Sequence, residues 1–208
     1  MPTPPAYGVP MRLGRNVVVR TALDLLNEVG LDGLTLRRIA TELDVQAPAL
    51  YWHVKNKREL LDEMAAMIFA DALSGLETPR RGESWVEWTA ETARRLRATM
   101  LGYRDGARVL SGNYLTNAGL GRPMELALRT LCDAGFTLKD AARGITAVYS
   151  YVQGFTIEEQ AETSPVEADD RFPLAALAMR EIMSDNDERF EHGLRLMLSG
   201  LRLSRFSG

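Results

Sequence analysis

The chain has 208 residues, of which 46% are hydrophobic and 25% charged, and its formal net charge is −3. This length allows a small unit followed by a larger domain with its own core. A single cysteine, Cys132, excludes an internal disulfide framework and indicates a reducing compartment. Because no apolar run approaches the roughly 20 residues that cross a bilayer, we expect a cytoplasmic protein without membrane contact.

The N-terminal segments are predicted to be an arm and one helix. Residues 1–10 are rich in proline and have no apolar signal-peptide core, which indicates a disordered arm. From Asn16 to Val29, apolar residues recur along one face at helical spacing, and Gly30 follows as a C-terminal stop. We therefore expect a helix over 16–29.

The segment 35–57 has the pattern of two short helices joined by a tight turn. Thr35 can cap the first helix. Its apolar face recurs at i, i+3, i+4 and i+7 in Leu36, Ile39, Ala40 and Leu43. Asp44 and Val45 are expected to form the bend. Pro48 then stands in the first turn of the second helix, where the N–H that proline lacks would have no helical partner.

The second of these helices carries groups suited to contact DNA. Tyr51, Trp52 and His53 are expected on its surface, and Lys55 and Lys57 follow. Two helices at a steep angle, with exposed aromatic and basic groups on the second, indicate a helix-turn-helix whose second helix enters the major groove. The charge agrees, since residues 1–60 carry a net charge of +2 and the rest −5. Double-stranded DNA is therefore the expected partner of this end.

Helix follows helix in the rest of the chain. Periodicity and capping patterns predict a short helical segment between Arg104 and Gly112 and longer helices after Lys57 up to Gly75 and over about 84–101, 120–134, 137–162, 173–183 and 185–203. No segment shows sustained strand alternation. The sequence therefore predicts an all-α protein with an arm at 1–10, a DNA-binding domain at 11–58 and a larger helical body at 59–208.

Two of the predicted body helices carry more apolar surface than one core contact requires. Their apolar residues are Ala141, Ile145, Val148, Tyr149, Val152 and Phe155, and then Phe190, Leu194, Met197, Leu198 and Leu201. Gly193 and Gly200 would allow close helix approach. A four-helix bundle between two copies would bury this surplus, whereas in a monomer both helices would be central. A homodimer is favoured, because one short recognition helix reads too few base pairs to find an operator.

These features resemble the TetR family of bacterial transcriptional repressors, most nearly its tetracycline-responsive members. The resemblance is dense in ALDLLNEVGLDGLTLRRIA and PALYWHVKNKRELLD, and it recurs in the body as GESW, RDGARV, LCDAGF and IEEQ. It implies a homodimeric, all-helical repressor of a near-palindromic operator. The body would serve for ligand binding and dimerisation, and a small-molecule effector bound there would release the DNA.

The resemblance also implies which residues lie at the DNA. Arg37 would read a guanine edge through its forked N–H groups. Alanines at 47 and 49 stand where tetracycline-responsive members have polar residues, so we expect a different operator with more methyl contact. Trp52 has the alternative of packing inside the N-terminal domain. The implied DNA-binding residues are Arg37, Ala47, Pro48, Ala49, Tyr51, Trp52, His53 and Lys57.

The body departs from tetracycline-responsive members at the pocket positions. Those members hold magnesium-tetracycline with histidines and other polar residues, whereas this chain has two histidines, His53 and His192. Without imidazole or a carboxylate cluster a hard cation has little to bind, so we expect no metal and no cofactor. A mostly apolar pocket for a hydrophobic or polyketide-like effector is expected instead. Its candidate residues are Thr92, Leu96, Leu110, Asn113, Tyr149, Ser150, Gln153 and Glu158, with Leu73 and Ala127 as further matching positions.

Two candidate catalytic pairs carry little weight. Glu158 and Glu159 would point about 100° apart on a helix, so their carboxylates do not converge. Cys132 and His192 lie on separate predicted helices without a third group. We therefore expect that this protein is not an enzyme. The remaining alternative is a DNA-binding regulator or activator whose body serves only dimerisation or protein-partner binding.

Overall fold

The structure is a computed structural model that describes residues 13–76, 79, 82–111, 121–161, 171–182 and 185–204. Every regular element in these ranges is an α-helix and none is a strand, which confirms the all-α prediction. No described helix is long and apolar enough to span a membrane. The predicted arm and Asn113 lie outside the described residues. The helices are α1 (Arg15–Gly33), α2 (Leu36–Glu42), α3 (Ala47–Leu50), α4 (Lys57–Ala72), α5 (Trp85–Leu101), α6 (Gly106–Leu110), α7 (Gly121–Asp133), α8 (Leu138–Gln160), α9 (Pro173–Ile182) and α10 (Asn186–Ser204).

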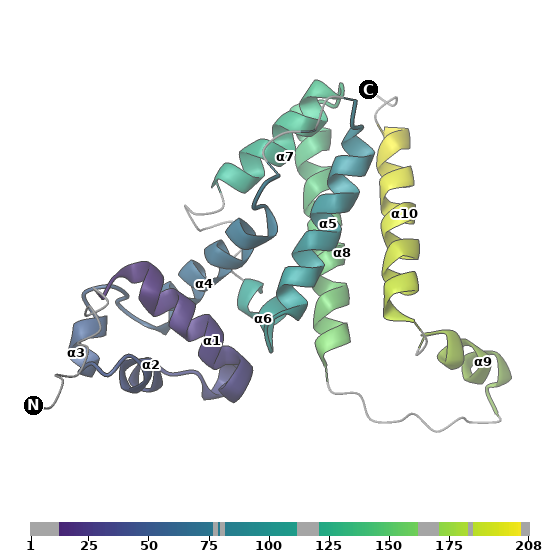
Figure 1. The fold of residues 1–208 in the computed structure, drawn as a ribbon. Helices are drawn as coiled ribbons and strands as arrows, with labels where there is room; N and C mark the ends of the chain where they lie inside the picture. Colours follow the sequence, from purple (N-terminus) through teal and green to yellow (C-terminus); the bar gives the residue numbers. More distant parts are fainter. Residues whose placement is uncertain are drawn as a thin grey trace, which may run out of the picture.

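Helices α1 to α3 form a small N-terminal unit, here called the head (Figure 1). Thr35 caps α2 by accepting the N–H of Arg38 at 3.2 Å, as the sequence predicted. Asp44 adopts a left-handed conformation with φ 52° and turns the chain from α2 toward α3. The core of the head contains the buried residues Val18, Leu26, Leu34, Ile39 and Leu50.

Helix α1 is interrupted where the sequence predicted its end. Gly30 has φ 66°, which side chains other than glycine rarely adopt, and the chain makes one more turn to Gly33. A Cβ atom at Gly30 would lie 3.0 Å from the Asp105 carboxylate, so glycine is needed here for space as well as for conformation. This position is therefore where the head meets the body.

The remaining helices form the body, in which α5, α8 and α10 run side by side while α7 crosses one end (Figure 1). The predicted capping box starts α5, with Ser84 and Glu87 exchanging hydrogen bonds of 2.8 and 3.2 Å. Arg97 of α5 forms a two-pronged pair with Glu159 of α8 at 2.8 and 2.6 Å, and its guanidinium lies 4.8 Å from the Phe190 ring of α10. These contacts fix the three helices relative to one another.

The apolar residues that suggested surplus surface on α8 and α10 lie mainly inside the protomer. Phe190, Leu194 and Leu198 are buried, as are Ala141, Val148, Tyr149 and Val152. Gly193 allows close approach within the chain, because a Cβ there would overlap the ring and hydroxyl of Tyr151. Periodicity identified the apolar faces correctly, but it does not tell whether the same chain or a second copy covers them.

Candidate functional site

The recognition segment is shorter as a helix than the sequence predicted. Helix α3 ends at Leu50, and Tyr51 is its C-cap. The Leu50 carbonyl accepts both the His53 N–H at 2.8 Å and the Val54 N–H at 2.9 Å, so the chain makes one tight turn after α3 ends. Leu50 and Val54 are both fully buried, so the tight turn places both against the core of the head. Trp52 and His53 therefore lie on a turn that projects from the head.

The aromatic residues of this turn face solvent. Trp52 is 88% exposed and Tyr51 is 54% exposed, which argues against packing of Trp52 inside the head. Pro48 is exposed too, whereas Ala47 and Ala49 are half-buried, as is His53. Large apolar side chains gathered on a surface usually mark a binding site. The predicted DNA-facing residues of α3 and its following turn are thus largely accessible.

The two predicted basic contacts differ in their surroundings. Arg37 is exposed on α2, and its guanidinium has no ion pair with the residues the structure describes. The Lys57 ammonium instead donates to the Leu31 carbonyl at 3.0 Å, near the C-terminal end of α1. A cation is favourable there because of the helix dipole. A phosphate contact by Lys57 stays a prediction. To make it, the ammonium must either bind the phosphate with another of its N–H groups or give up its hydrogen bond to Leu31.

The body contains an apolar cavity of about 80 Å³ between α4, α5, α7 and α8. The Phe69 and Tyr149 rings stack in its wall with centroids 5.7 Å apart. None of the described residues that line it is Asp, Glu, His, Lys or Arg. Within the described ranges, no group of three His, Cys, Asp or Glu residues is placed to hold a metal ion. The cavity therefore suits an uncharged, largely apolar compound.

Several of the predicted ligand residues meet at this cavity. Thr92, Leu96 and Tyr149 line it, together with the matching positions Leu73 and Ala127. The others do not line it: Leu110 is buried on α6, Ser150 and Glu158 are exposed on α8, and Gln153 is half-buried on α8. These four remain predictions without support from the cavity.

Trp88 and Thr89 also line the cavity, and the sequence analysis missed them. Both belong to the helix that carries Thr92 and Leu96, and Trp88 precedes Thr92 by one helical turn. Extending the face of Thr92 and Leu96 backward by helical spacing would have found both residues.

Helix α4 connects the recognition segment to the cavity. It begins at Lys57, shortly after the turn that carries Trp52, and its side chains Phe69 and Ala72 line the cavity at its other end. A helix of 16 residues is about 24 Å long. Arg20 of α1 pairs with Asp71 of α4 at 2.8 Å, so the head is also attached along the length of α4. Helix α4 thus joins the segment before it to the cavity wall as one continuous element.

Residues before and within α6 form a second link between head and body. The Leu31 N–H donates to the Asp105 carboxylate at 2.8 Å, and the Arg104 N–H donates to the Asn27 side chain at 2.8 Å. Asp105 also pairs with Arg108 at 3.0 Å. Burial opposes ionisation of Asp105, but the Leu31 N–H and the Arg108 guanidinium outweigh it, and the pKa of Asp105 is lowered.

The same segment is anchored to the body by Gln160, at the end of α8. The Gln160 amide accepts from the Ala107 N–H at 3.0 Å and donates to the carbonyls of Tyr103 and Met100 at 2.7 and 3.1 Å. Gly106 lies so close to the Met100 carbonyl that a Cβ there would overlap it. Helix α6 is thus held between the ends of α5 and α8 on one side and α1 on the other.

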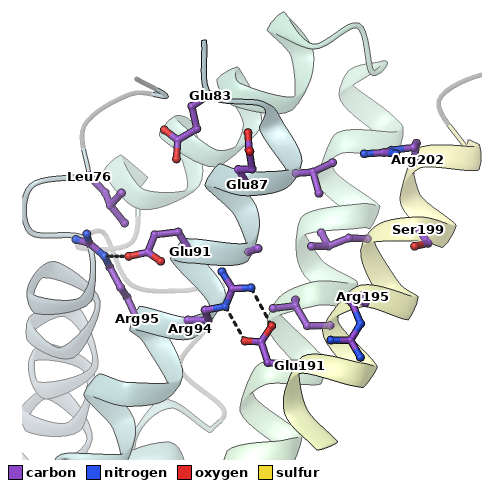
Figure 2. Close-up of a pocket in the computed structure, with 14 residues that line it drawn as sticks. Leu76, Glu83, Glu87, Glu91, Arg94, Arg95, Glu191, Arg195, Ser199 and Arg202 are labelled. Carbon is purple, nitrogen blue, oxygen red and sulfur yellow. Dashed lines mark hydrogen bonds and ion pairs between the residues drawn. The ribbon is translucent and has the colours of Figure 1, made fainter. Parts of the chain in front are cut away.

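A larger groove of about 540 Å³ lies between α5 and α10 and has a different character (Figure 2). Its walls carry glutamates and arginines that pair with one another. Arg94 forms two hydrogen bonds with Glu191, at 2.6 and 2.8 Å, and Arg95 pairs with Glu91 at 2.7 Å (Figure 2). These pairs cross-link α5 to α10 and stabilise α5 itself. None of the predicted ligand residues lines this groove.

Two family models match this chain in the same order as its head and body. The model of bacterial regulatory proteins of the tetR family matches residues 18–64, and the model of the tetracyclin repressor-like C-terminal domain matches residues 78–205. The chain belongs to the TetR family. Membership confirms the resemblance that the sequence motifs suggested, and it covers both parts of the molecule.

Individual members of the TetR family are similar along nearly the whole chain. The tetracycline repressor protein class A from transposon 1721 of Escherichia coli is 41% identical over 207 residues, 93% of each chain. A TetR variant from Acinetobacter baumannii AYE, solved in complex with minocycline, is 38% identical, with a TM-score of 0.76 over 93% of this chain and 99% of that one. A possible TetR family regulator from Streptomyces coelicolor is 39% identical, with a TM-score of 0.80 over 91% and 99%.

Proposed function

We propose that this TetR-family protein is a homodimeric transcriptional repressor that binds near-palindromic operator DNA and leaves it when a small, mostly hydrophobic effector occupies the body cavity. It acts by binding and not by catalysis, in line with its class A relative, which is named a repressor. The observation that carries the proposal is helix α4, which starts beside the exposed recognition turn and ends in the cavity wall.

The accessible surface of the head supports operator binding. An exposed Arg37 on α2 and the exposed Pro48, Tyr51 and Trp52 in and after α3 provide a base-reading fork and apolar groups for thymine methyls. Phosphate contacts would come from neighbouring groups such as His53, and they would fix the position of the head without reading sequence. A single head of this size covers few base pairs, so two are required.

Surfaces left open on α8 and α10 support the homodimer. On α10, Leu196 is 62% exposed and Leu203 is 73% exposed, and the open Gly200 lies between them on the same face. On α8, Gly154 has no neighbour within 4 Å of the position of a Cβ. Leucines and glycines at helical spacing allow two copies of a helix pair to approach closely. A four-helix bundle formed by α8 and α10 of both protomers would bury this stripe.

Helix α9 offers further apolar surface to a second copy. It stands apart from the rest of the body (Figure 1), and Leu174 and Leu177 are 82% and 61% exposed. Burial of these exposed leucine side chains would be energetically favourable, so a second surface that covers them would stabilise α9. We expect α9 to lie against the partner protomer in the dimer.

The cavity argues for an effector without a metal ion. Relatives in the family bind tetracyclines, as the minocycline complex of the Acinetobacter baumannii protein illustrates. In this chain the cavity wall lacks histidine and carboxylate side chains throughout its described part. Since Mg²⁺ prefers oxygen ligands that include carboxylates, none of the described lining residues would hold it. The effector is therefore proposed to bind alone.

Release of DNA follows from a shift between two conformations. When the effector occupies the cavity, it displaces the end of α4 at Phe69 and Ala72, and the two heads move from the spacing of about 34 Å that fits successive major grooves. To move most molecules into the second conformation, the effector must favour it by several kcal/mol, about 5 for a shift from 1:99 to 99:1.

Selection of genomic DNA tests the proposal. The purified protein is mixed with fragmented DNA from its own organism at near-physiological salt, and the retained fragments are sequenced. The proposal predicts one enriched near-palindrome with half-sites about one helical turn apart, bound by two protomers. Weak retention without a shared sequence, or a single unpaired site bound by one protomer, would contradict it.

A further inference from the structure

We propose that Gln46 reads the edge of an adenine base in each operator half-site through the carboxamide of its side chain. The inference rests on the proposed binding of operator DNA and names a residue that sets the sequence preference of the head. Gln46 was not among the residues that the family resemblance implied at the DNA, and its contact would add to that of Arg37.

Gln46 stands at the start of the recognition segment and faces solvent. It directly precedes α3, and it is exposed. Its backbone is extended, with φ −73° and ψ 138°, and its carbonyl accepts the Ala49 N–H at 2.8 Å. The backbone is thus tied into the first turn of α3, while the residue stays accessible from outside the head. In a helix-turn-helix, residues at this end of the second helix reach base edges in the major groove.

The Gln46 carboxamide takes no part in holding the head together. Before α2, Thr35 caps the helix by accepting the Arg38 N–H at 3.2 Å. Before α4, Asn56 does the same for the Glu59 N–H at 2.9 Å. Gln46 makes no such capping bond, and its carboxamide has no hydrogen-bond partner among the residues that the structure describes. Its donor and its acceptor are therefore both available to a molecule bound at the head.

The next four residues leave hydrogen bonding at this end of α3 to Gln46. Residues 47–50 are Ala, Pro, Ala and Leu, whose side chains neither donate nor accept hydrogen bonds. A carboxamide matches adenine, because its oxygen accepts from adenine N6 while its NH₂ group donates to adenine N7. The Arg37 guanidinium only donates and so matches guanine. Gln46 and Arg37 would therefore specify different bases.

Selection from a library of random DNA sequences tests the inference on the full-length protein. Wild type, Gln46→Ala and Gln46→Glu are compared, and the bound DNA is sequenced. We expect the wild type to prefer adenine at one position of each half-site. In Gln46→Ala this preference should fall about tenfold or more, as is typical of a bidentate base contact, while the other positions keep theirs. Gln46→Glu should favour cytosine there, because a carboxylate accepts from cytosine N4 but cannot donate to adenine N7.

A modified base and a matched variant serve as controls. In 7-deazaadenine a C–H group replaces the N7 acceptor. At the selected adenine it should weaken wild-type binding about fivefold, the ratio typical of one net hydrogen bond, and should leave Gln46→Ala nearly unaffected. Asn16→Ala removes an exposed amide from α1, outside the helix-turn-helix, and should keep all base preferences.

Four results would overturn the inference. They are an unchanged adenine preference in Gln46→Ala, an equal loss of affinity for all sequences, a lost preference for a base other than adenine, and an equal effect of 7-deazaadenine on wild type and Gln46→Ala. In each case, a near-palindrome selected by the wild type would leave the operator proposal intact. If the wild type enriches no sequence, the operator proposal fails, and the reading of adenine by Gln46 fails with it.

Discussion

At the scale of single residues, the head separates residues that read DNA from residues that hold its core. Leu50 and Val54 are fully buried on either side of Tyr51, Trp52 and His53, so the turn between them is forced outward. The large aromatic side chains of Tyr51 and Trp52 lie on this turn and face solvent. Arg37, on the neighbouring helix, is the exposed side chain whose geometry best matches a guanine edge.

The variant Arg37→Ala should weaken binding to the selected operator by about 10- to 100-fold and leave nonspecific binding nearly unchanged, because a bidentate base contact is worth about 1–3 kcal/mol of discrimination. Competition between operator and scrambled DNA measures both affinities. Arg129→Ala on α7, an exposed arginine paired only with Glu125 in the described structure, serves as the control. An equal loss on both DNAs would show that Arg37 meets phosphate.

The variant Gly106→Ala should destabilise the protein by about 3 kcal/mol, since its Cβ would overlap the backbone carbonyl of Met100 and that carbonyl cannot move without disturbing the end of α5. The midpoint of urea unfolding measures this loss. Gly121→Ala, where a Cβ meets no atom within 4 Å, should change stability by less than about 1 kcal/mol. Equal stability of the two variants would contradict the close contact between Gly106 and the Met100 carbonyl.

At the scale of elements, most helices could be predicted from the sequence, because their signals are local. The caps at Thr35 and Ser84 and the glycine at position 30 lie where the sequence placed them. The short extent of α3 could not be predicted, because Leu50 and Val54 lie four residues apart and are both buried, a pattern that a longer helix would also show. Local sequence signals also do not tell which surface covers an apolar helix face. Phe190 and Leu194 were candidates for a dimer interface, but they are buried within the protomer itself.

The candidate cavity was partly predictable for the same reason. Family resemblance pointed to Thr92 and Leu96, and both line the cavity. It also pointed to Leu110 and Ser150, which do not line it, since a pocket depends on how α6 and α8 turn relative to α5. Trp88 was missed because no chemical motif marks an aromatic residue inside an amphipathic helix.

The contact between α1 and α6 should respond to acid. The lowered pKa of Asp105 means that its ionised form is favoured in the folded state, so its contribution is present above the unfolded value of about 3.9 and is lost as the pH falls through the lower folded value. Exchange protection of the Leu31 amide, which donates to Asp105, should therefore be constant between about pH 5 and 8 after correction for intrinsic rates, and should fall below about pH 4.

The variant Asp105→Asn provides the control for this acid response. It should lose about 1–2 kcal/mol of stability at neutral pH, as expected when a charge-assisted hydrogen bond becomes neutral, and protection of Leu31 should no longer depend on pH near 4. Unchanged protection of Leu31 in this variant would mean that Asp105 does not hold the head to the body.

At the scale of the whole molecule, the central claim is that occupancy of the cavity controls the distance between two heads. Helix α4 carries this coupling, and the contacts of Asp105 and Gln160 at α6 supply a second connection between head and body. Because α5, α8 and α10 are cross-linked by the Arg97 pairs, the body is expected to stay rigid while the head moves.

The most direct test is the distance between two spin labels, one on each head. A label at Asp24→Cys, exposed on α1, in a Cys132→Ser background gives one label per protomer. Pulsed electron paramagnetic resonance then measures the distance on operator DNA, without DNA, and without DNA in the presence of a small uncharged compound that binds the cavity. We predict one narrow distance on DNA and a shifted distance when the compound occupies the cavity, as a change in the fluorescence of the cavity-lining Trp88 would report. An occupied cavity with an unchanged distance between the heads would contradict it.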